Sequence, residues 1–249
     1  MSILEELEDD IYTYKNIKDI NMDIKNAADV IKDQKCIIIK NVISKSYCKE
    51  AIKYLEKISN SSFPNYFPLN KDTPNHFRLN YDDERASVKG HFMQFNIFLK
   101  NQDLLDTANV FKEIFKIKDK ISFELNNRET FYDSFLPSDE FISRVGYQFY
   151  ESGKGYLEEH RDFVGENQKV VPSLIISKKG KDFYTGGFFF KNENGKTIYP
   201  EEYAEVGDII IFNPDLIHGV TLIDKDIAPK ERNHLNGRWM AFITTTKMT

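Results

Sequence analysis

The spacing of hydrophobic and polar residues divides the chain into two regions that meet near residue 120. In the first region, residues 1–35 carry apolar side chains at roughly helical spacing among charged ones, which predicts one or two peripheral helices. A short β-rich run follows at 35–40. After Ser44, a favourable N-cap, apolar residues recur on one helical face as far as Ile58. This pattern predicts a strand followed by an amphipathic helix.

The middle of the chain is expected to be richer in loops. Segment 59–90 is dense in Ser, Asn, Pro and Asp, which discourage regular structure. Long loops in compact enzymes are often binding loops or lids. Residues 91–99 again have the pattern of a strand, and residues 103–117 that of a helix with its apolar residues on one side.

Beyond residue 121 the pattern changes to short β-rich runs separated by clusters of Gly, Asn, Pro and Asp. These runs lie at 141–150, 155–159, 171–177, 184–191, 196–199, 208–213, 218–223 and 238–246. About eight short strands at this spacing predict an antiparallel sandwich or barrel, including the jelly roll. Because no linker or repeat is visible, we expect one domain over 1–249. In it, 1–120 packs on a β core formed by 121–249.

Composition narrows the class of protein without defining it. The chain has 249 residues, 41% hydrophobic and 29% charged, which are ordinary values for a globular protein. A net charge of −5 lacks the basic excess that nucleic-acid binding needs. No apolar run is long enough to span a bilayer, and the acidic N-terminus does not resemble a signal peptide. Cys36 and Cys48 form no CxxC pair and are expected as small buried residues in a reducing, cytoplasmic compartment.

One histidine of the five stands out because it has a carboxylate two residues away. In an extended segment, His160 and Asp162 would point to the same face and could bind one metal ion from adjacent positions. Alone, such a triplet is common, and the alternative is a strand-end histidine paired with its neighbour. The other histidines have simpler interpretations: His91 as a structural residue that begins a strand, and His234 in a solvated loop.

His218 is the best candidate for a third ligand. It follows a Gly-Asp turn at 207–208, an apolar strand and a turn that contains proline. Gly219 beside it would let backbone or ligand approach closely. Two histidines and one carboxylate that leave coordination positions open form the pattern of non-haem Fe(II) oxygenases.

Several segments, in this order, resemble the catalytic domain of the iron(II)/2-oxoglutarate-dependent oxygenases, closest to the prolyl-4-hydroxylase-like branch. They are a tyrosine, a glycine turn and the His-x-Asp triplet in 150–162, a Gly-Gly strand in 186–190, the segment 207–220 and the strand 237–242. Residues 37–58 are similar to the entry segment of phytanoyl-CoA-hydroxylase-like members. The resemblance leaves 59–135 unmatched. It implies a mainly β fold with flanking helices: a double-stranded β-helix core (jelly roll, cupin-like) with an N-terminal α/β elaboration.

The resemblance also implies the cofactors and their ligands. Fe(II) would be held by His160, Asp162 and His218, and 2-oxoglutarate would be the cosubstrate together with O₂. Arg238 would bind the far carboxylate of the cosubstrate, for which a planar, permanently charged guanidinium is well suited. Tyr150 would lie near the same cosubstrate and donate its hydroxyl. Arg232, in a polar loop, is the competitor of Arg238.

The implied activity is that of a dioxygenase that hydroxylates an unactivated C–H of a small molecule, such as an amino acid or a biosynthetic intermediate, and releases succinate and CO₂. Asp162 favours hydroxylation, because halogenating members of the family have a small residue there. Arg78, Arg85 and Arg161 are candidates for substrate binding, and their alternative interpretation is as surface residues. Three other functions stay open: a protein side-chain hydroxylase, a non-catalytic cupin-like binding protein, and a manganese or zinc hydrolase. No nucleic-acid or membrane partner is expected, and the oligomeric state is left open.

Overall fold

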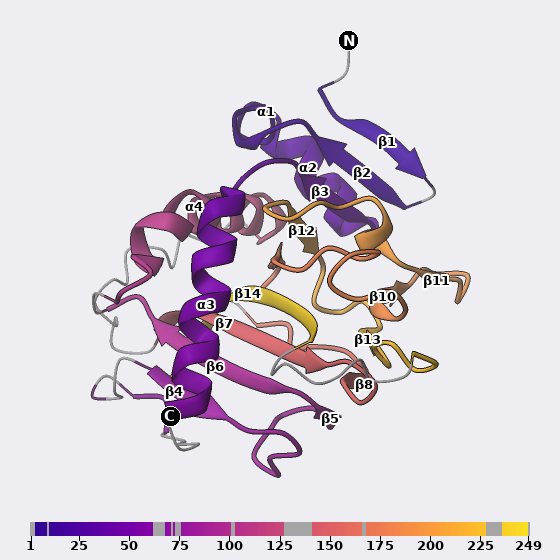
Figure 1. Ribbon diagram of the computed structural model, residues 1–249. Helices are drawn as coiled ribbons and strands as arrows, with labels where there is room; N and C mark the ends of the chain where they lie inside the picture. The colour runs from indigo at the N-terminus through magenta and orange to yellow at the C-terminus, as the bar shows by residue number, and fades with distance from the viewer. Residues whose placement is uncertain are drawn as a thin grey trace.

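The computed structural model describes residues 3–8, 10–61, 68–70, 72, 76–100, 103–126, 141–165, 168–227 and 236–248. Within these ranges a nine-stranded and a five-stranded sheet pack together, and helices cover the outer face of the larger sheet (Figure 1). The helices are α1 (Ile17–Met22), α2 (Ile24–Lys32), α3 (Lys45–Ser61), α4 (Thr107–Asn126) and the 3₁₀ turn η1 (Pro200–Glu202). The strands are β1 (Glu5–Glu8), β2 (Ile11–Tyr14), β3 (Cys36–Ile39), β4 (His76–Leu79), β5 (Gly90–His91), β6 (Met93–Phe98), β7 (Phe141–Glu151), β8 (Tyr156–His160), β9 (Val171–Ile175), β10 (Gly187–Lys191), β11 (Thr197–Ile198), β12 (Ile209–Phe212), β13 (His218–Thr221) and β14 (Gly237–Lys247).

Eight strands from the second half of the chain form the centre of both sheets. The order is β12-β9-β14-β7 in the larger sheet and β11-β10-β13-β8 in the smaller one, and every neighbouring pair is antiparallel. Chain neighbours such as β7 and β8 lie in different sheets, as in a jelly roll. The prediction of a mainly β, double-stranded β-helix core with flanking helices is confirmed.

The first half of the chain extends the larger sheet at both edges. Strands β1, β2 and β3 continue it beyond β12, and β6 and β4 continue it beyond β7, while β5 extends the smaller sheet beside β8. Both additions therefore pair directly with core strands. The expectation that residues 1–249 form one catalytic domain stays a prediction.

Alternation along the strands divides the apolar residues between two cores. In β3, Ile37 and Ile39 pack under the helices, whereas Cys36 and Ile38 pack between the two sheets. A strand buried on both faces must be apolar throughout, which explains the continuous Cys-Ile-Ile-Ile run. Both cysteines are buried and free, as predicted.

The N-terminal prediction was wrong for residues 5–14 and correct for the helices that follow. Residues 11–14 form β2, which pairs in parallel with β3, and residues 5–8 form β1. The β-rich sequence of Ile11–Tyr14 is short and surrounded by charged residues, so its pairing with a distant apolar strand outweighed the local helical spacing. The connection from β2 to β3 runs through α1 and α2, as a parallel crossover requires.

Two further predictions concern helix ends. Ser44 caps α3, because its hydroxyl oxygen accepts a hydrogen bond from the Tyr47 backbone N–H at 3.2 Å. Helix α4 extends to Asn126, beyond the predicted end at 117, and its additional turns bury Ile121. Strand β4 lies within the stretch 59–90 that was expected as loop, of which 62–67, 71 and 73–75 lie outside the described residues.

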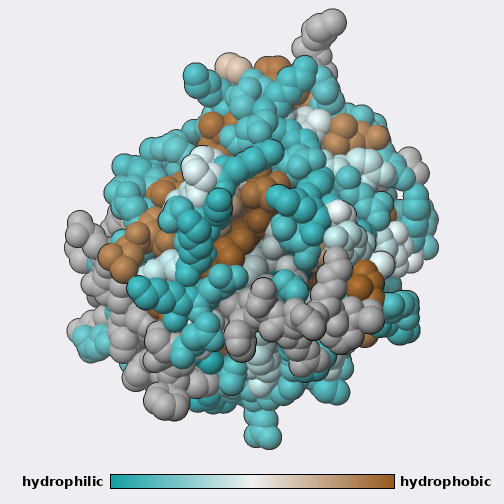
Figure 2. Space-filling model, viewed as in Figure 1, coloured by the Kyte–Doolittle hydropathy of each residue, from teal (hydrophilic) through white to brown (hydrophobic). Residues whose placement is uncertain are grey.

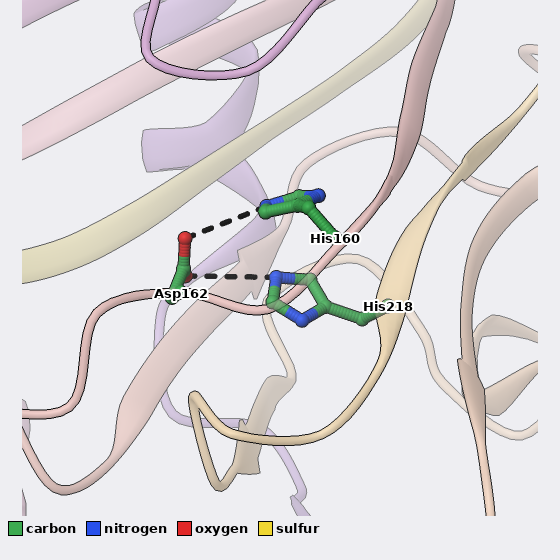
Figure 3. Close-up of side chains that lie close together, drawn as sticks. All are labelled: His160, Asp162 and His218. Atoms are coloured by element: carbon green, nitrogen blue, oxygen red, sulfur yellow. Dashed lines mark ion pairs between the residues drawn. The ribbon is translucent and has the colours of Figure 1, made fainter.

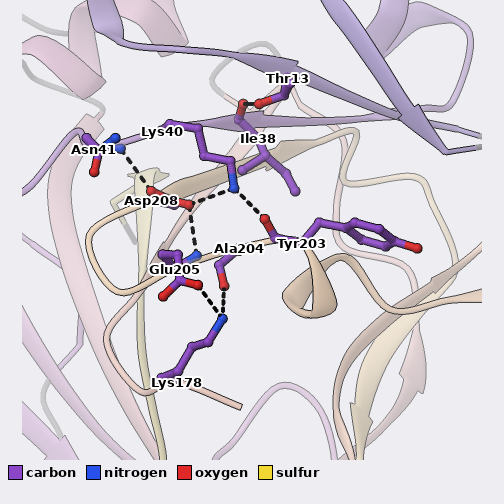
Figure 4. Close-up of polar contacts among 9 residues, drawn as sticks. All are labelled: Thr13, Ile38, Lys40, Asn41, Lys178, Tyr203, Ala204, Glu205 and Asp208. Atoms are coloured by element: carbon purple, nitrogen blue, oxygen red, sulfur yellow. Dashed lines mark hydrogen bonds and ion pairs between the residues drawn. The ribbon is translucent and has the colours of Figure 1, made fainter. Parts of the chain in front are cut away.

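The Gly-Asp sequence before β12 ties the N-terminal region to the core (Figure 4). The buried Asp208 carboxylate accepts hydrogen bonds from the backbone N–H groups of Asn41 and Glu205, both at 2.8 Å, and pairs with Lys40 at 3.1 Å. Gly207 has a φ of +96°, and a Cβ there would lie 2.1 Å from the Ile43 carbonyl oxygen. Gly207 and Asp208, which belong to a segment that resembles the oxygenase family, therefore have a structural role in this protein.

The face of the molecule seen in Figure 2 is mainly hydrophilic, with apolar side chains gathered in a hollow near its centre. None of the helices in the described part of the chain combines the length and the apolar character needed to cross a bilayer.

Candidate active site

Three predicted metal ligands meet where the two sheets face each other (Figure 3). His160 ends β8 and His218 begins β13, and the two residues are direct cross-strand neighbours in the antiparallel pair. Asp162 follows β8 and is held by a hydrogen bond from its backbone N–H to the Pro214 carbonyl at 2.9 Å. The sequence predicted that a distant strand would bring His218 beside the His-x-Asp triplet, and the strand pairing shows how.

Backbone carbonyls fix the tautomer of both imidazoles. The Nδ1–H of His160 donates to the Glu158 carbonyl, and that of His218 donates to the Leu216 carbonyl, each at 2.8 Å. Each ring therefore directs Nε2 towards Asp162, whose two carboxylate oxygens lie 3.4 Å and 3.5 Å from these nitrogens. A second hydrogen bond of this kind is the usual way in which proteins orient a metal-binding histidine.

The charges at the triad also suit a cation. Burial opposes the charged form of Asp162, but the two histidines outweigh it, and the pKa of this carboxyl is lowered far below its usual range. Burial lowers the pKa of His160, yet the hydrogen bond to Asp162 and the Glu158 carbonyl outweigh it, so the net pKa is raised. One ligand atom from each residue lies within 4.8 Å of the others. Ligands at about 2.1 Å from one metal ion are about 3 Å apart when they occupy adjacent positions, so a small contraction would close the site.

Arg238 lies beside the triad and is held by a buried carboxylate. Its Nε and Nη2 donate to one oxygen of Glu201 at 2.8 Å and 2.6 Å, and both side chains are almost completely buried. The other Glu201 oxygen accepts the Phe188 backbone N–H at 3.0 Å. Gly187 makes room for this carboxylate, because a Cβ there would lie 2.4 Å from it. The remaining guanidinium nitrogen, Nη1, is buried and has no hydrogen-bond partner among the residues that the structure describes.

Tyr150 is the cross-strand neighbour of Arg238 and lies at the end of a row of polar side chains. Its ring is 5.2 Å from the Arg238 guanidinium carbon, and its hydroxyl donates to Gln148 at 2.7 Å. Burial raises the pKa of Tyr150 far above its usual range, although Arg238 opposes the shift. The phenol is therefore protonated, and donation of its hydroxyl to a cosubstrate stays a prediction because that hydrogen is directed to Gln148.

One cavity of about 870 Å³ contains the triad, Arg238 and Tyr150. Arg85 and Arg161 also line it, and each has a carboxylate nearby: Arg85 pairs with Asp83 at 2.6 Å, and Arg161 lies 3.5 Å from Asp215. Their roles in substrate binding stay predictions.

Arg78 is not brought to this cavity. Its guanidinium donates to the Ser59 carbonyl at 2.8 Å and lies over the ring of Phe95, which packs under the helices. Because Phe95 alternates with Gln94, which lines the cavity, Arg78 belongs to the opposite face of the sheet. A contact between Arg78 and a substrate has no support from this placement.

Sequence reasoning did not identify Glu201, nor the polar residues at 94, 144 and 148 that line the cavity. Glu201 is 37 residues from Arg238 and stands in a Pro-Glu-Glu turn that reads as surface. Arg144 and Gln148 had a usable signal: they alternate with apolar residues along a predicted strand, on the same face as Tyr150. Arg232 and His234 lie outside the described residues.

Fold and site together define a double-stranded β-helix that carries a two-histidine, one-carboxylate site in its interior. No protein-family model matches the chain, and no curated protein is significantly similar to it. Solved structures share the fold, with identities low enough that the likeness concerns the fold alone.

A full-length Neurospora crassa protein in complex with alpha-KG is 12% identical, covers 99% of this chain and 88% of its own, and has a TM-score of 0.57. A Pseudomonas putida prolyl-4-hydroxylase is 12% identical, and the match covers 90% of this chain and 98% of the hydroxylase, with a TM-score of 0.51. A Trichoplax adhaerens prolyl hydroxylase, in complex with a peptide fragment of hypoxia inducible factor, is 12% identical. The match covers 91% of each chain, with a TM-score of 0.51. The fold is thus shared with prolyl hydroxylases, in agreement with the resemblance seen in the sequence.

Proposed function

We propose that this chain is an Fe(II)- and 2-oxoglutarate-dependent dioxygenase that hydroxylates a C–H bond of a small molecule. The observation that carries the proposal is the presence in one cavity of the His160-Asp162-His218 triad and of Arg238, whose buried Nη1 has no partner among the residues that the structure describes. The reaction consumes O₂ and 2-oxoglutarate. One oxygen atom enters the new hydroxyl group and the other enters succinate, with loss of CO₂.

The donor set fits iron. Two neutral imidazoles and one carboxylate bind three positions on one side of a metal ion and leave the others open. Bound there, the iron supplies the O₂ chemistry that amino-acid side chains lack. The chain supplies the orientation: the carbonyls of Glu158 and Leu216 hold both Nε2 atoms towards Asp162.

The chain also supplies a place for the dicarboxylate. Its keto and adjacent carboxylate oxygens would face the metal, and its far carboxylate would meet Arg238, a charge-assisted contact that is strong in a dry site. Glu201 fixes the guanidinium before the cosubstrate arrives. Phe188 and Phe212 lie against His218 in the same cavity, with ring centroids 6.1 Å and 4.9 Å from the imidazole, and exclude water.

A small-molecule substrate is supported by the shape of the site. A cavity of about 870 Å³ lies within the range of about 300–1,000 Å³ that small-molecule sites have. The alternative, hydroxylation of a side chain on a protein partner, requires that a peptide segment reach the triad through the mouth of this cavity.

The test is an anaerobic titration of the metal-free protein with Fe(II), with and without 2-oxoglutarate, that follows the weak visible band of the iron–oxoglutarate chelate. We expect a band that needs both components, is absent in His160→Ala, and requires about 100-fold more 2-oxoglutarate in Arg238→Ala, since one charged hydrogen-bonding partner contributes about 1.5–3 kcal/mol. A folded, iron-loaded protein that shows no band would refute the proposal and favour a binding protein with this fold.

A further inference from the structure

Two glutamines on neighbouring strands lie side by side in the wall of the cavity. Gln94 of β6 and Gln148 of β7 are direct cross-strand partners, and both line the cavity. They are nearly buried, with exposed fractions of 8% and 9%. Gln148 precedes Tyr150 by two residues on the same face of β7, so the pair lies about 7 Å along the sheet from Tyr150 and its partner Arg238. The proposed function uses neither glutamine.

Hydrogen bonds join the two carboxamides in a row that runs from Tyr150 to Asn96. The Tyr150 hydroxyl donates to the side-chain oxygen of Gln148 at 2.7 Å. The Gln148 nitrogen donates to the Gln94 oxygen at 2.8 Å, and the Gln94 nitrogen donates to the Asn96 oxygen at 2.9 Å. Each glutamine is therefore held by one hydrogen bond that it accepts and by one that it donates.

An arginine at the end of the row fixes its direction. Nη1 of Arg144 donates to the same Asn96 side chain at 2.6 Å, and a guanidinium cannot accept, so the Asn96 atom that it contacts must be oxygen. The Gln94 atom on that oxygen must then be nitrogen, which leaves the Gln94 oxygen for Gln148. By the same step, the Gln148 oxygen faces the Tyr150 hydroxyl. Both carboxamides are thus fixed in one orientation before a ligand binds.

Each of these carboxamides can form further hydrogen bonds. A primary carboxamide has two N–H donors and two oxygen lone pairs, and the row uses one of each in Gln94 and in Gln148. Among the residues that the structure describes, neither side chain has another hydrogen-bonding partner. Each glutamine therefore has one donor and one acceptor left for a ligand in the cavity, and the pair carries no net charge.

These groups select a ligand that both donates and accepts. A carboxylate or a ketone only accepts, and an ammonium group only donates, so each would leave nearly buried groups unpaired. An amide does both. In an open-chain amide the trans bond directs N–H and C=O to opposite sides, whereas a small ring holds the amide cis and directs both to one side. A carboxamide can pair with such an edge through two hydrogen bonds, as glutamine does with the edge of adenine.

Apolar side chains flank the glutamines. Met240 is the partner of Gln148 on the other neighbouring strand, β14, and it lines the cavity together with Phe92. The centroid of the Phe92 ring lies 5.9 Å from that of Tyr150, and Phe92, Tyr150 and Met240 belong to one hydrophobic cluster. A ligand bound at the glutamines therefore has apolar surface beside its polar edge, which suits the carbon skeleton of a ring.

We propose that the substrate is an uncharged cyclic amide, a lactam or a cyclic imide, and that Gln94 and Gln148 bind the N–H and C=O on its edge. This inference rests on the proposed function, because it names the class of the second ligand of that site. The cosubstrate occupies the triad and Arg238, which leaves the glutamines of the larger sheet to the substrate. The carbon that is hydroxylated lies on the opposite side of the ring, towards the triad.

The experiment compares the metal-free protein with its anaerobic Fe(II)–2-oxoglutarate complex. The probes are γ-butyrolactam, δ-valerolactam, ε-caprolactam and glutarimide. Each is matched with its N-methyl derivative, and each lactam also with the lactone of the same ring size. Binding is followed by the shift of the thermal midpoint and, in the complex, by the change in the visible band. We expect the cyclic amides to bind about 10-fold more tightly than these analogues, which leave a nearly buried group unpaired.

Two variants and a control assign this preference to the glutamines. Gln94→Met and Gln148→Met keep the length of the side chain without its hydrogen bonds, and each should abolish most of the 10-fold preference. The readout is the ratio of two affinities in the same variant, which a loss of stability alone does not change. Asn194 is an exposed carboxamide outside the cavity, so Asn194→Ala should keep the full preference.

The outcomes separate this inference from the proposed function. A normal visible band in both glutamine variants, together with loss of the preference for cyclic amides, supports a substrate site distinct from that of the cosubstrate. If the wild-type protein has no such preference, or if both variants keep it, the inference is wrong while the dioxygenase proposal stands. Loss of the band in both variants would place the glutamines in the cosubstrate site and overturn the inference. A wild-type protein without the band would refute the dioxygenase, and with it the assignment of a cyclic amide as substrate.

Discussion

At the scale of single residues, Glu201 decides how much positive charge Arg238 offers. Two of the three guanidinium nitrogens already donate to the Glu201 carboxylate, and within the described ranges Nη1 has no partner. Burying a charged pair is costly unless its geometry is good, and removal of one partner leaves an uncompensated charge in the interior. The pair therefore holds the arginine in the metal-free protein and also limits its attraction for a second carboxylate.

Replacement of Glu201 by glutamine tests this arrangement. Glu201→Gln keeps an oxygen that can accept from Nε but removes the negative charge, so we expect the affinity for 2-oxoglutarate to rise about tenfold. The metal-free protein should lose about 3 kcal/mol of unfolding free energy, because the buried arginine is no longer neutralised. Calorimetric titration and denaturant unfolding measure the two effects.

The neighbouring carboxylate provides the control for that experiment. Glu202 pairs with Lys179 at the surface, with half of its side chain exposed, so Glu202→Gln should change neither quantity. Weaker binding of 2-oxoglutarate in Glu201→Gln would show that the carboxylate orients the arginine more than it competes for it.

The raised pKa of His160 predicts how metal binding depends on pH. A metal ion binds the neutral imidazole, so protons compete with it below this pKa, which lies above the ordinary 6.5. Asp162 stays ionised throughout because its pKa is lowered. Affinity for Mn(II) should fall about tenfold per pH unit below the pKa of His160. In the metal-free protein, the charged pair stabilises the fold below that pKa and ceases to do so as the pH rises through it.

Anaerobic titration over a pH range that begins well above the ordinary pKa of a histidine and ends below it measures this dependence. His91 is also partly buried and pairs with a carboxylate, Asp82, and His91→Gln should leave the profile unchanged. An affinity that does not vary with pH would contradict the protonation state assigned to His160.

At the scale of elements, the site depends on junctions more than on the strands themselves. The Asp208 carboxylate joins the end of β3 to the start of β12 through three hydrogen-bonding partners. The histidines depend on the pairing of β8 with β13, and Arg238 depends on that of β14 with β7. Local sequence could predict these strands, but their pairing joins residues as distant as 39 and 209.

Loss of the Asp208 junction should destabilise the fold. Asp208→Ala removes the hydrogen bonds that the backbone N–H groups of Asn41 and Glu205 donate to a charged carboxylate, and each such bond contributes about 1.5–3 kcal/mol. We expect a loss of about 3 kcal/mol in unfolding free energy by denaturant titration, with unchanged metal affinity in the folded fraction. Asp226→Ala, at an exposed position, is the matched control and should have no measurable effect. Equal stability of both variants would remove the structural role assigned to the Gly-Asp turn.

At the scale of the whole molecule, the sequence predicted the β core and the triad but not how the site is completed. The His-x-Asp triplet and the Gly-flanked His218 carry local signals, because the spacing of two residues and the small neighbour have direct geometric meaning. Glu201 carries no such signal, because its contact with Arg238 joins residues that are 37 positions apart in the sequence. The strand at 11–14 was missed because only its partner β3 makes it a strand.

Ligand binding should stabilise the whole molecule only when both components are present. At a free concentration of 100 times its dissociation constant, 2-oxoglutarate should add about 2.7 kcal/mol to the metal-loaded protein. It should add much less to the metal-free protein or to His218→Ala, which lack the chelate. Glutarate, which has no keto oxygen, is the control ligand. Thermal unfolding under anaerobic conditions measures the difference, and equal stabilisation by the two acids would contradict chelation.

The central claim is that one cavity holds the metal and the cosubstrate at the places that the side chains define. A crystal structure of the anaerobic Fe(II)–2-oxoglutarate complex tests it most directly. The account predicts iron bound to Nε2 of His160 and of His218 and to an oxygen of Asp162, with the far carboxylate on Nη1 of Arg238 and the region around Arg144 free of cosubstrate. Iron bound elsewhere, or 2-oxoglutarate held by Arg144 instead of Arg238, would contradict the account.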